Sequence, residues 1–177
     1  GGMSVGTVRR IAEALGADIN IVVRWRGGEI DRLLDEGHAA LVGRTAALLD
    51  AEGWQALPEV TFAIYADRGS IDLLAWHAPT STLLVVEVKT ELASIEETLR
   101  THDMKGRLAG RVALERAGWR ARAVARLLVL PDTSAARRRV ARHGEVLGRA
   151  YPITGRSARA WLAEPSGVQG LLLFLAS

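Results

Sequence analysis

Several residue types that often carry function are rare or missing in this chain of 177 residues. It has no cysteine, which excludes disulfide bonds and thiolate metal sites and fits a cytoplasmic protein. No apolar run approaches the roughly 18 residues that a membrane-spanning helix requires, and nothing at the N-terminus has the pattern of a signal peptide. Lysine occurs only at Lys89 and Lys105, and the other basic residues are arginine. The net charge of +3 does not by itself indicate a nucleic-acid partner.

The scarcity of lysine draws attention to the positions where it does occur. Lys89 ends the apolar run Leu83–Lys89 and follows Glu87 by two residues. An arginine stays charged and planar, whereas a lysine ammonium is a compact point charge whose pKa shifts readily when it is buried. A lysine at the end of an apolar strand, next to a carboxylate, therefore indicates a site that needs an amine.

The spacing of apolar residues predicts alternating helices and strands. Helices are expected at 4–15, 30–52, 94–117, 134–148 and 157–162, and strands at 19–25, 55–65, 70–76, 83–89, 123–130 and 170–175. From residue 30 onward the order is helix, three strands, helix and strand. This order predicts an α/β fold with three layers, in which helices flank a central mixed sheet. We expect residues 1–29 to form an N-terminal appendage and residues 30–177 the main domain.

The strands at 70–76 and 83–89 are expected to form a hairpin. A turn centred between Pro79 and Thr80 would pair Trp76 with Leu83, Leu74 with Val85, and Asp72 with Glu87. Side chains alternate along a strand, so Lys89 would lie on the same face as the two carboxylates. Facing carboxylates repel each other, and a bound cation would relieve that repulsion. Two carboxylates, a backbone carbonyl and waters suit Mg²⁺, or Mn²⁺ in its place.

The two strands that carry these residues, Gly69–Trp76 and Leu84–Thr90, resemble the metal-binding hairpin of the PD-(D/E)XK superfamily of restriction endonuclease-like nucleases. The motif is closest to that of the Holliday junction resolvase-like members. The similarity extends over about residues 35–130, and the order αβββαβ matches the core of that superfamily. Ile71 stands where the proline of the motif's name would be.

The resemblance implies a Mg²⁺-dependent deoxyribonuclease that hydrolyses DNA phosphodiester bonds by metal-activated water, with endonuclease cleavage favoured. Asp72 and Glu87 would be metal ligands, together with the carbonyl of Val88. Lys89 would orient or deprotonate the attacking water. These three charged residues, Asp72, Glu87 and Lys89, are the expected catalytic residues.

Members of this superfamily often add an acidic residue from the first helix, and Asp35 and Glu36 compete for that role. Asp35 is favoured because it lies three residues before His38, on the same helix face. His38 would be an accessory group near phosphate or a second ion. A solvated acidic turn beside a partly buried histidine explains the same residues equally well. Lys105 is expected to contact phosphate or to support the site, and Glu59 is a weaker candidate.

Arginines on two of the predicted helices are possible contacts to DNA phosphates. Each phosphate that is neutralised would add a salt-dependent contribution to affinity. A solvated helix face explains such charges as well, and it is the better explanation for Arg100 and Arg111. The expected DNA-binding arginines are Arg107, Arg137, Arg138 and Arg139, with Arg142 beside them.

The segment Thr7–Gly16 resembles the end of a phage-repressor-type helix-turn-helix domain, of which it would be a remnant. This resemblance motivates the alternative function, a DNA-binding transcriptional regulator or an inactive binding module with a nuclease fold. A plain helix and strand that pack on the domain explain the segment equally well. The strand predicted at 19–25 would need covering at its edge, which favours a homodimer.

Overall fold

The structure, a computed structural model, describes residues 28–176, and it describes side chains from Glu36 onward. The described residues from Arg32 onward form one compact unit. The helix predicted at 4–15, the strand predicted at 19–25 and the helix-turn-helix resemblance all lie outside the described residues. None of the helices in the described part has the length and apolar character needed to cross a membrane.

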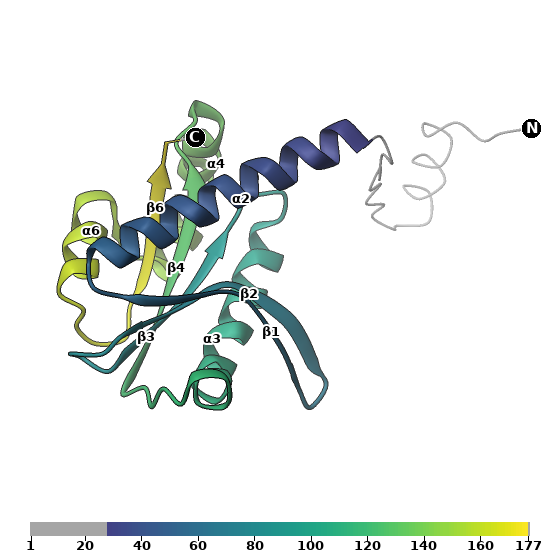
Figure 1. The fold of residues 1–177 in the computed structure, drawn as a ribbon. Helices are drawn as coiled ribbons and strands as arrows, with labels where there is room; N and C mark the ends of the chain where they lie inside the picture. Colours follow the sequence, from purple (N-terminus) through teal and green to yellow (C-terminus); the bar gives the residue numbers. More distant parts are fainter. Residues whose placement is uncertain (1–27, 177) are drawn as a thin grey trace, which may run out of the picture. The chain divides into compact units, whose positions relative to one another are not determined.

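The elements alternate between helices and strands in an α/β order (Figure 1). They are α2 (Gly28–Ala51), β1 (Gln55–Ile64), β2 (Asp67–His77), β3 (Thr82–Val88), α3 (Ile95–Ala117), β4 (Ala123–Pro131), α4 (Ser134–Arg142), α5 (Gly144–Ala150), β5 (Ile153–Thr154), α6 (Gly155–Ala163) and β6 (Gly170–Leu175).

Within the described residues the strands form one six-stranded mixed sheet in the order β1-β2-β3-β4-β6-β5. β1, β2 and β3 pair as an antiparallel meander, whereas β3, β4, β6 and β5 run parallel. The change from antiparallel to parallel pairing occurs at β3. Residues of β3 are therefore followed by a helical crossover, α3, before the chain returns as β4.

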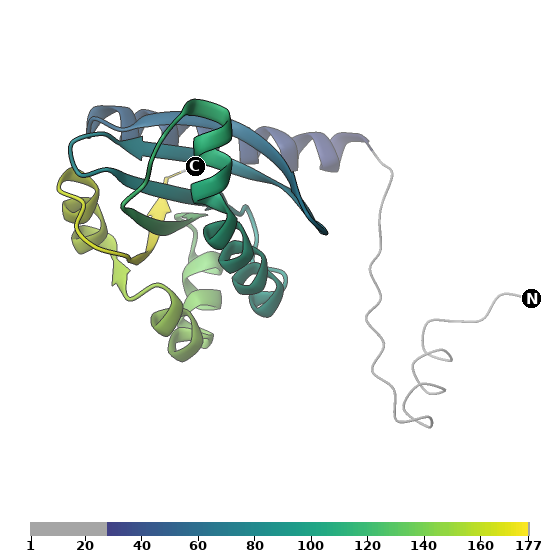
Figure 2. The ribbon, with the colours of Figure 1, turned by 90° about the horizontal axis from the view of Figure 1, so that it is seen from below.

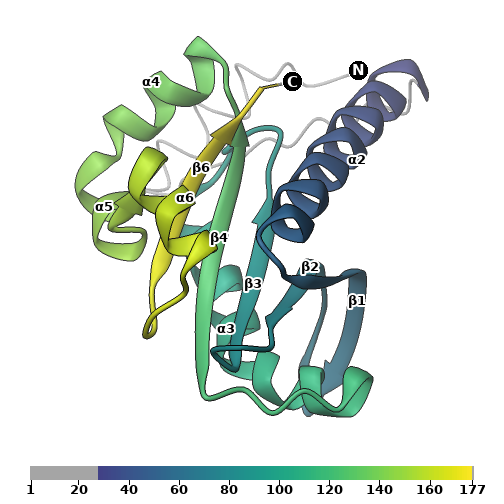
Figure 3. The same cartoon turned by 60° about the vertical axis from the view of Figure 1, so that its left-hand side comes forward.

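Helices cover both faces of this sheet and give it three layers, as predicted (Figures 2 and 3). On one face, α2 and α6 pack through Leu41, Leu49 and Leu162 against alternate residues of the inner strands, among them Val86 and Val88. α3 packs on the other face through Ala109, Val112 and Ala113, and α5 packs there through Leu147. β3 is buried along its whole length, because both of its faces are covered.

α3 begins and ends where its sequence signals predict. Ser94 is its N-cap and accepts a hydrogen bond from the backbone N–H of Glu97. Gly118 ends the helix in the left-handed conformation, at φ 71°, which costs little without a Cβ atom. These two caps determine which turns of α3 face the end of β3.

Two features of the fold differ from the prediction. The expected helix at 134–148 is two helices, α4 and α5, because His143 leaves helical geometry (φ −111°, ψ 26°) directly before Gly144. The two-residue strand β5 was not predicted, since Ile153–Thr154 is too short to show a period-two pattern. Elsewhere the predicted helices and strands agree with the observed ones to within about three residues at each end.

Candidate active site

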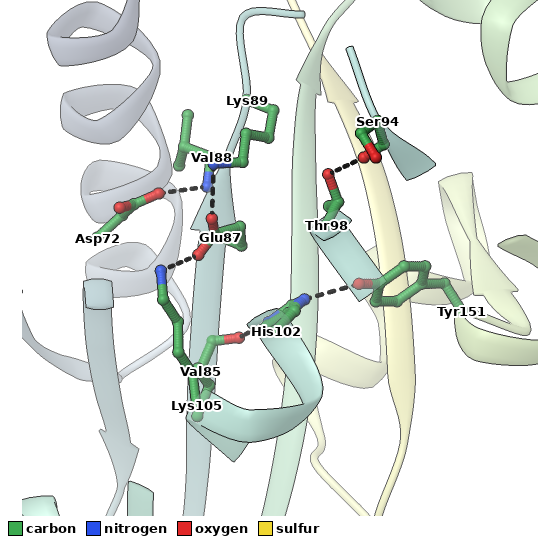
Figure 4. Close-up of polar contacts among 10 residues, drawn as sticks. All are labelled: Asp72, Val85, Glu87, Val88, Lys89, Ser94, Thr98, His102, Lys105 and Tyr151. Atoms are coloured by element: carbon green, nitrogen blue, oxygen red, sulfur yellow. Dashed lines mark hydrogen bonds and ion pairs between the residues drawn. The ribbon is translucent and has the colours of Figure 1, made fainter. Parts of the chain in front are cut away.

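The β2–β3 hairpin brings the three expected catalytic residues to the carboxyl end of β3 (Figure 4). Its register is the predicted one, with Trp76 opposite Leu83 and Leu74 opposite Val85. The ladder stops at the pair Leu73–Val86, so the expected direct pairing of Asp72 with Glu87 is not part of it. Beyond that pair the backbone N–H of Val88 donates to the carboxylate of Asp72, with 2.7 Å between Val88 N and Asp72 Oδ2. A side chain thus takes the place of a backbone acceptor where the strands part.

Glu87 is the centre of the site and is only 2% exposed. Both of its carboxylate oxygens contact lysines: Oε1 lies 2.8 Å from Lys89 Nζ, and Oε2 lies 2.5 Å from Lys105 Nζ. Burial by itself would raise the pKa of Glu87. The two ammonium groups, Lys105 more than Lys89, overcome this effect and hold that pKa below its usual value. Glu87 is therefore ionised at neutral pH although it is buried.

The neighbouring carboxylate, Asp72, is in the opposite electrostatic situation. Burial and the negative charge of Glu87 raise its pKa, and the Val88 N–H, Lys105 and His38 lower it only in part. Oδ2 accepts the hydrogen bond from Val88, and among the side chains described from Glu36 onward no lysine or arginine forms an ion pair with Asp72. An added positive charge between Asp72 and Glu87 would relieve this repulsion.

The donors present fit a hard divalent cation that keeps most of its waters. Asp72 and Glu87 offer carboxylate oxygens, and Val88 offers a backbone carbonyl beside them, which is a donor set that suits Mg²⁺. In the part of the chain that the structure describes, no group of three or more histidine, aspartate or glutamate side chains could hold a metal. The protein would therefore contribute few ligands, and water or substrate phosphate would supply the rest.

Lys89 is the most accessible of the three charged residues, with 39% of its side chain exposed. Burial works to lower its pKa, but its hydrogen bond and charge interaction with Glu87 raise the pKa above the usual lysine value. Lys89 is thus an ammonium at neutral pH and can donate hydrogen bonds. Of the two roles expected for it, orienting the attacking water agrees better with this charge than deprotonating it.

A pocket of about 310 Å³ opens beside Glu87 and Lys89, between the end of β3 and the first turns of α3. Its walls are largely polar, and Lys105 forms part of them. It is lined by Ser94, the N-cap of α3, and by the α3 residues Glu97, Thr98, Thr101 and Lys105. The pocket gives solvent and a ligand access to a carboxylate that is otherwise buried.

A buried polar pair beneath the site was not predicted. His102 is fully buried one turn before Lys105, and it bridges α3 to β3 and to Tyr151. Its Nε2 lies 3.0 Å from the Val85 carbonyl oxygen and its Nδ1 lies 2.7 Å from the Tyr151 hydroxyl. Burial lowers the pKa of His102 to about 4, so the ring is neutral. Nε2 then donates to Val85, and Nδ1 accepts from Tyr151.

One sequence signal was available for this pair. Thr98, His102 and Lys105 recur at helical spacing, and all three are buried on the face of α3 that meets the sheet. Farther along the same face the buried residues are apolar. A polar first half and an apolar second half of one buried helix face indicate that the polar residues serve a site.

Of the accessory residues expected from the first helix, His38 is the one that the structure places near Asp72. His38 is half-buried and close enough to Asp72 to lower the pKa of that carboxyl. It also lines a shallow pocket together with Glu59, an exposed residue of β1. Asp35 lies on α2, but its side chain is outside the described residues. Glu36 is exposed.

Two of the predicted DNA-binding arginines have structural roles. Arg137 forms two hydrogen bonds to Asp132, at 2.6 and 3.0 Å, and lies over the ring of Phe174. Arg139 donates to the carbonyl oxygens of Leu92 and Ala93. The exposed guanidinium of Arg107 lies 3.6 Å from Asp103. Arg138 and Arg142 are exposed on α4.

No protein-family model matches the chain, and no curated protein matches its sequence.

Proposed function

We propose that this chain is a metal-dependent nuclease of the PD-(D/E)XK type, which hydrolyses DNA phosphodiester bonds. The observation that carries the proposal is the pair of carboxylates where β2 and β3 part, of which Glu87 is buried and Asp72 is partly buried. One of them, Asp72, has its pKa raised by burial and by the charge of Glu87. A protein that only binds DNA gains nothing from two carboxylates held this close together.

Each residue of the site has a definite part in this chemistry. When bound, a divalent cation would lower the pKa of its water ligand and neutralise charge on the phosphate oxygens. Asp72 and Glu87 would hold that cation, and Lys89 would donate hydrogen bonds to the attacking water and a phosphate oxygen. The water oxygen bonds to phosphorus while the bond to the leaving sugar oxygen breaks. The water loses one proton to solvent, and the leaving oxygen takes one up.

Lys105 has a different part from Lys89. Only 7% of its side chain is exposed, and its ammonium lies 2.5 Å from Glu87. It keeps Glu87 ionised, and Lys89 is therefore not the only positive charge available to that carboxylate. This division of labour leaves the more exposed lysine for the substrate.

The test separates metal binding from cleavage. Asp72→Asn and Glu87→Gln should weaken Mn²⁺ binding, measured by electron paramagnetic resonance titration, and should abolish cleavage. Lys89→Met should still bind Mn²⁺ but should cut at least about a hundredfold more slowly, because it removes a hydrogen-bond donor at developing charge. Asp67→Asn is the matched control for Asp72→Asn, since Asp67 is an exposed carboxylate on the same strand, β2. The proposal is wrong if the purified protein with Mg²⁺ or Mn²⁺ cuts no linear, supercoiled, branched or single-stranded DNA.

One observation favours the alternative, an inactive nuclease-fold module that binds DNA. Both oxygens of Glu87 already contact ammonium groups, so this carboxylate is neutralised without any metal ion. A site of this kind is stable as a structural ion-pair cluster. DNA binding that is unchanged by removal of metal and by Glu87→Gln would support the alternative and contradict the nuclease.

A further inference from the structure

A second pocket shares lining residues with the pocket of the candidate active site and has no part in the chemistry described above. It has a volume of about 440 Å³ and lies between the β3–α3 loop and the first turns of α4. Glu91 and Ala93 line both this pocket and the pocket beside Glu87. Thr90, which directly follows Lys89, lines the second pocket as well. The two pockets are therefore neighbours along the loop that follows Lys89.

The second pocket is more apolar than the first. Its apolar lining includes Leu92, 5% exposed, and Leu130, which is fully buried. Ala135 and Ala136 form the α4 side. Small-molecule pockets are typically of about 300–1,000 Å³, with mostly apolar walls and a few polar groups that orient the ligand. The volume of this pocket and its small alanine side chains leave room for an aromatic base.

Arg139 is the positively charged residue that lines this pocket, where Thr90, Glu91 and Thr133 are the other polar residues. The guanidinium of Arg139 is held in one orientation because Nε donates to the Leu92 carbonyl at 3.1 Å and Nη2 donates to the Ala93 carbonyl at 2.9 Å. These two bonds restrain the planar group against the pocket wall. Planar guanidinium groups stack on nucleic-acid bases, and this one also carries the positive charge that attracts a phosphodiester strand.

We propose that this second pocket holds the base of an unpaired DNA nucleotide next to the phosphate that is cut, stacked on Arg139. The inference rests on the proposed function and adds the class of substrate. A base inside a duplex is stacked on both faces and paired at its edge, so it reaches a pocket only after it leaves the helix. The substrate is therefore single-stranded DNA, or the unpaired part of a branched or flapped DNA.

The experiment measures DNA binding by the full chain in Ca²⁺, a hard cation with the same preference for oxygen ligands. Fluorescence anisotropy compares three oligonucleotides of one length: a single strand, its duplex, and a single strand whose five central nucleotides are abasic. The abasic strand keeps every phosphate and loses only bases. We expect the wild type to prefer the intact single strand over the abasic one by about tenfold, the scale of one stacked base.

Two variants with matched controls connect this preference to the second pocket. Ala136→Leu fills the pocket and should reduce the preference to about one, with affinity for the abasic strand unchanged. Ala141→Leu, at an exposed position of the same helix, should keep it. Arg139→Ala should also lose the preference for the intact strand. Arg138→Ala removes an equal charge outside the pocket, so it should weaken the binding of the intact and the abasic strand by the same factor. Thermal melting of each variant verifies its fold.

The possible failures can be told apart. If the wild type cuts DNA with metal but binds intact and abasic strands equally, the base pocket is wrong and the nuclease proposal stands. If Ala136→Leu prefers the intact strand over the abasic strand as much as the wild type does, the pocket does not bind a base. If no DNA form is bound or cut, both proposals are wrong.

Discussion

At the scale of single residues, both lysines of the chain contact the same carboxylate. Lys89 and Lys105 lie on the two oxygens of Glu87, and every other basic residue is arginine. An ammonium is small enough to fit beside a buried carboxylate, where a guanidinium would need more space and more acceptors for its five donors. This argument applies to Lys105, of whose side chain only 7% is exposed.

The ion pair between Lys105 and Glu87 gives a test at this scale. Lys105→Met should lower the free energy of unfolding by about 1–3 kcal/mol, because it leaves a buried carboxylate with one partner fewer. The double variant Lys105→Met with Glu87→Gln should lose less than the sum of the two single variants, since the unpaired charge is then gone. Urea unfolding in metal-free buffer measures the free energy of unfolding of all three variants.

The matched control for Lys105→Met is Arg107→Met on the same helix. Arg107 pairs with Asp103, and its side chain is 71% exposed, so removing it should change stability by no more than about 0.5 kcal/mol. Equal losses for Arg107→Met and Lys105→Met would show that the buried pair does not stabilise the fold.

At the scale of elements, α3 connects the core to the candidate site. Its apolar second half packs on β2 and β3 through Ala109 and Val112, and its polar first half carries His102 and Lys105 beneath and beside Glu87. The link from His102 to Tyr151 joins this helix to the residue that ends α5. The position of Lys105 therefore depends on contacts made by three different elements.

Two glycine substitutions test two different effects, helix propensity at Gly110 and close packing at Gly170. Gly110, inside α3, has open space where a Cβ would lie, so Gly110→Ala should stabilise the protein by about 0.5–1 kcal/mol. Gly170 begins β6 with its Cα facing the Ala150 backbone, and a Cβ there would overlap with the Ala150 carbonyl oxygen. Gly170→Ala should therefore destabilise by about 1–3 kcal/mol or more.

Thermal or urea unfolding of the two glycine variants tests this contrast. A backbone carbonyl cannot rotate away as a side chain can, so relief at Gly170 requires β6 and α5 to separate. Similar stabilities of Gly170→Ala and the wild type would mean that these elements are not packed as closely as described.

At the scale of the whole molecule, stability depends on pH through groups buried between the sheet and the helices. His102 has a pKa of about 4 in the folded protein, whereas an unfolded histidine titrates near about 6.5. Below that value the unfolded chain takes up a proton that the folded protein does not. The contribution of His102 to the free energy of unfolding is therefore fully present above about pH 6.5 and is lost as the pH falls toward 4.

We expect His102 to remove about 2 kcal/mol of stability between pH 7 and pH 5. Urea unfolding at both pH values measures this loss, and His102→Gln should show a correspondingly smaller one. The comparison cancels the effects of Asp72, whose raised pKa acts in the opposite direction, and of Glu87, whose lowered pKa acts at more acid pH. An NMR titration midpoint of His102 near 6.5 would contradict the expectation.

Local sequence determined the order of elements and the register of the β2–β3 hairpin. Apolar periodicity and turn residues act over a few positions, and the turn near Pro79 fixes which residues of Asp67–His77 face those of β3. The grouping of Asp72, Glu87 and Lys89 at one end of the hairpin follows from that register and from the alternation of side chains.

The tertiary structure alone decided which distant groups meet at the site. Lys105 is 18 residues from Glu87, and His102 is 49 residues from Tyr151; only the packing of α3 on the sheet brings these pairs together. Packing likewise brought Arg139 to the carbonyl groups of the β3–α3 loop, and the sequence alone did not predict these hydrogen bonds. Short-range patterns specify helices and strands, but the partners of a buried charge depend on which surfaces the whole core buries against each other.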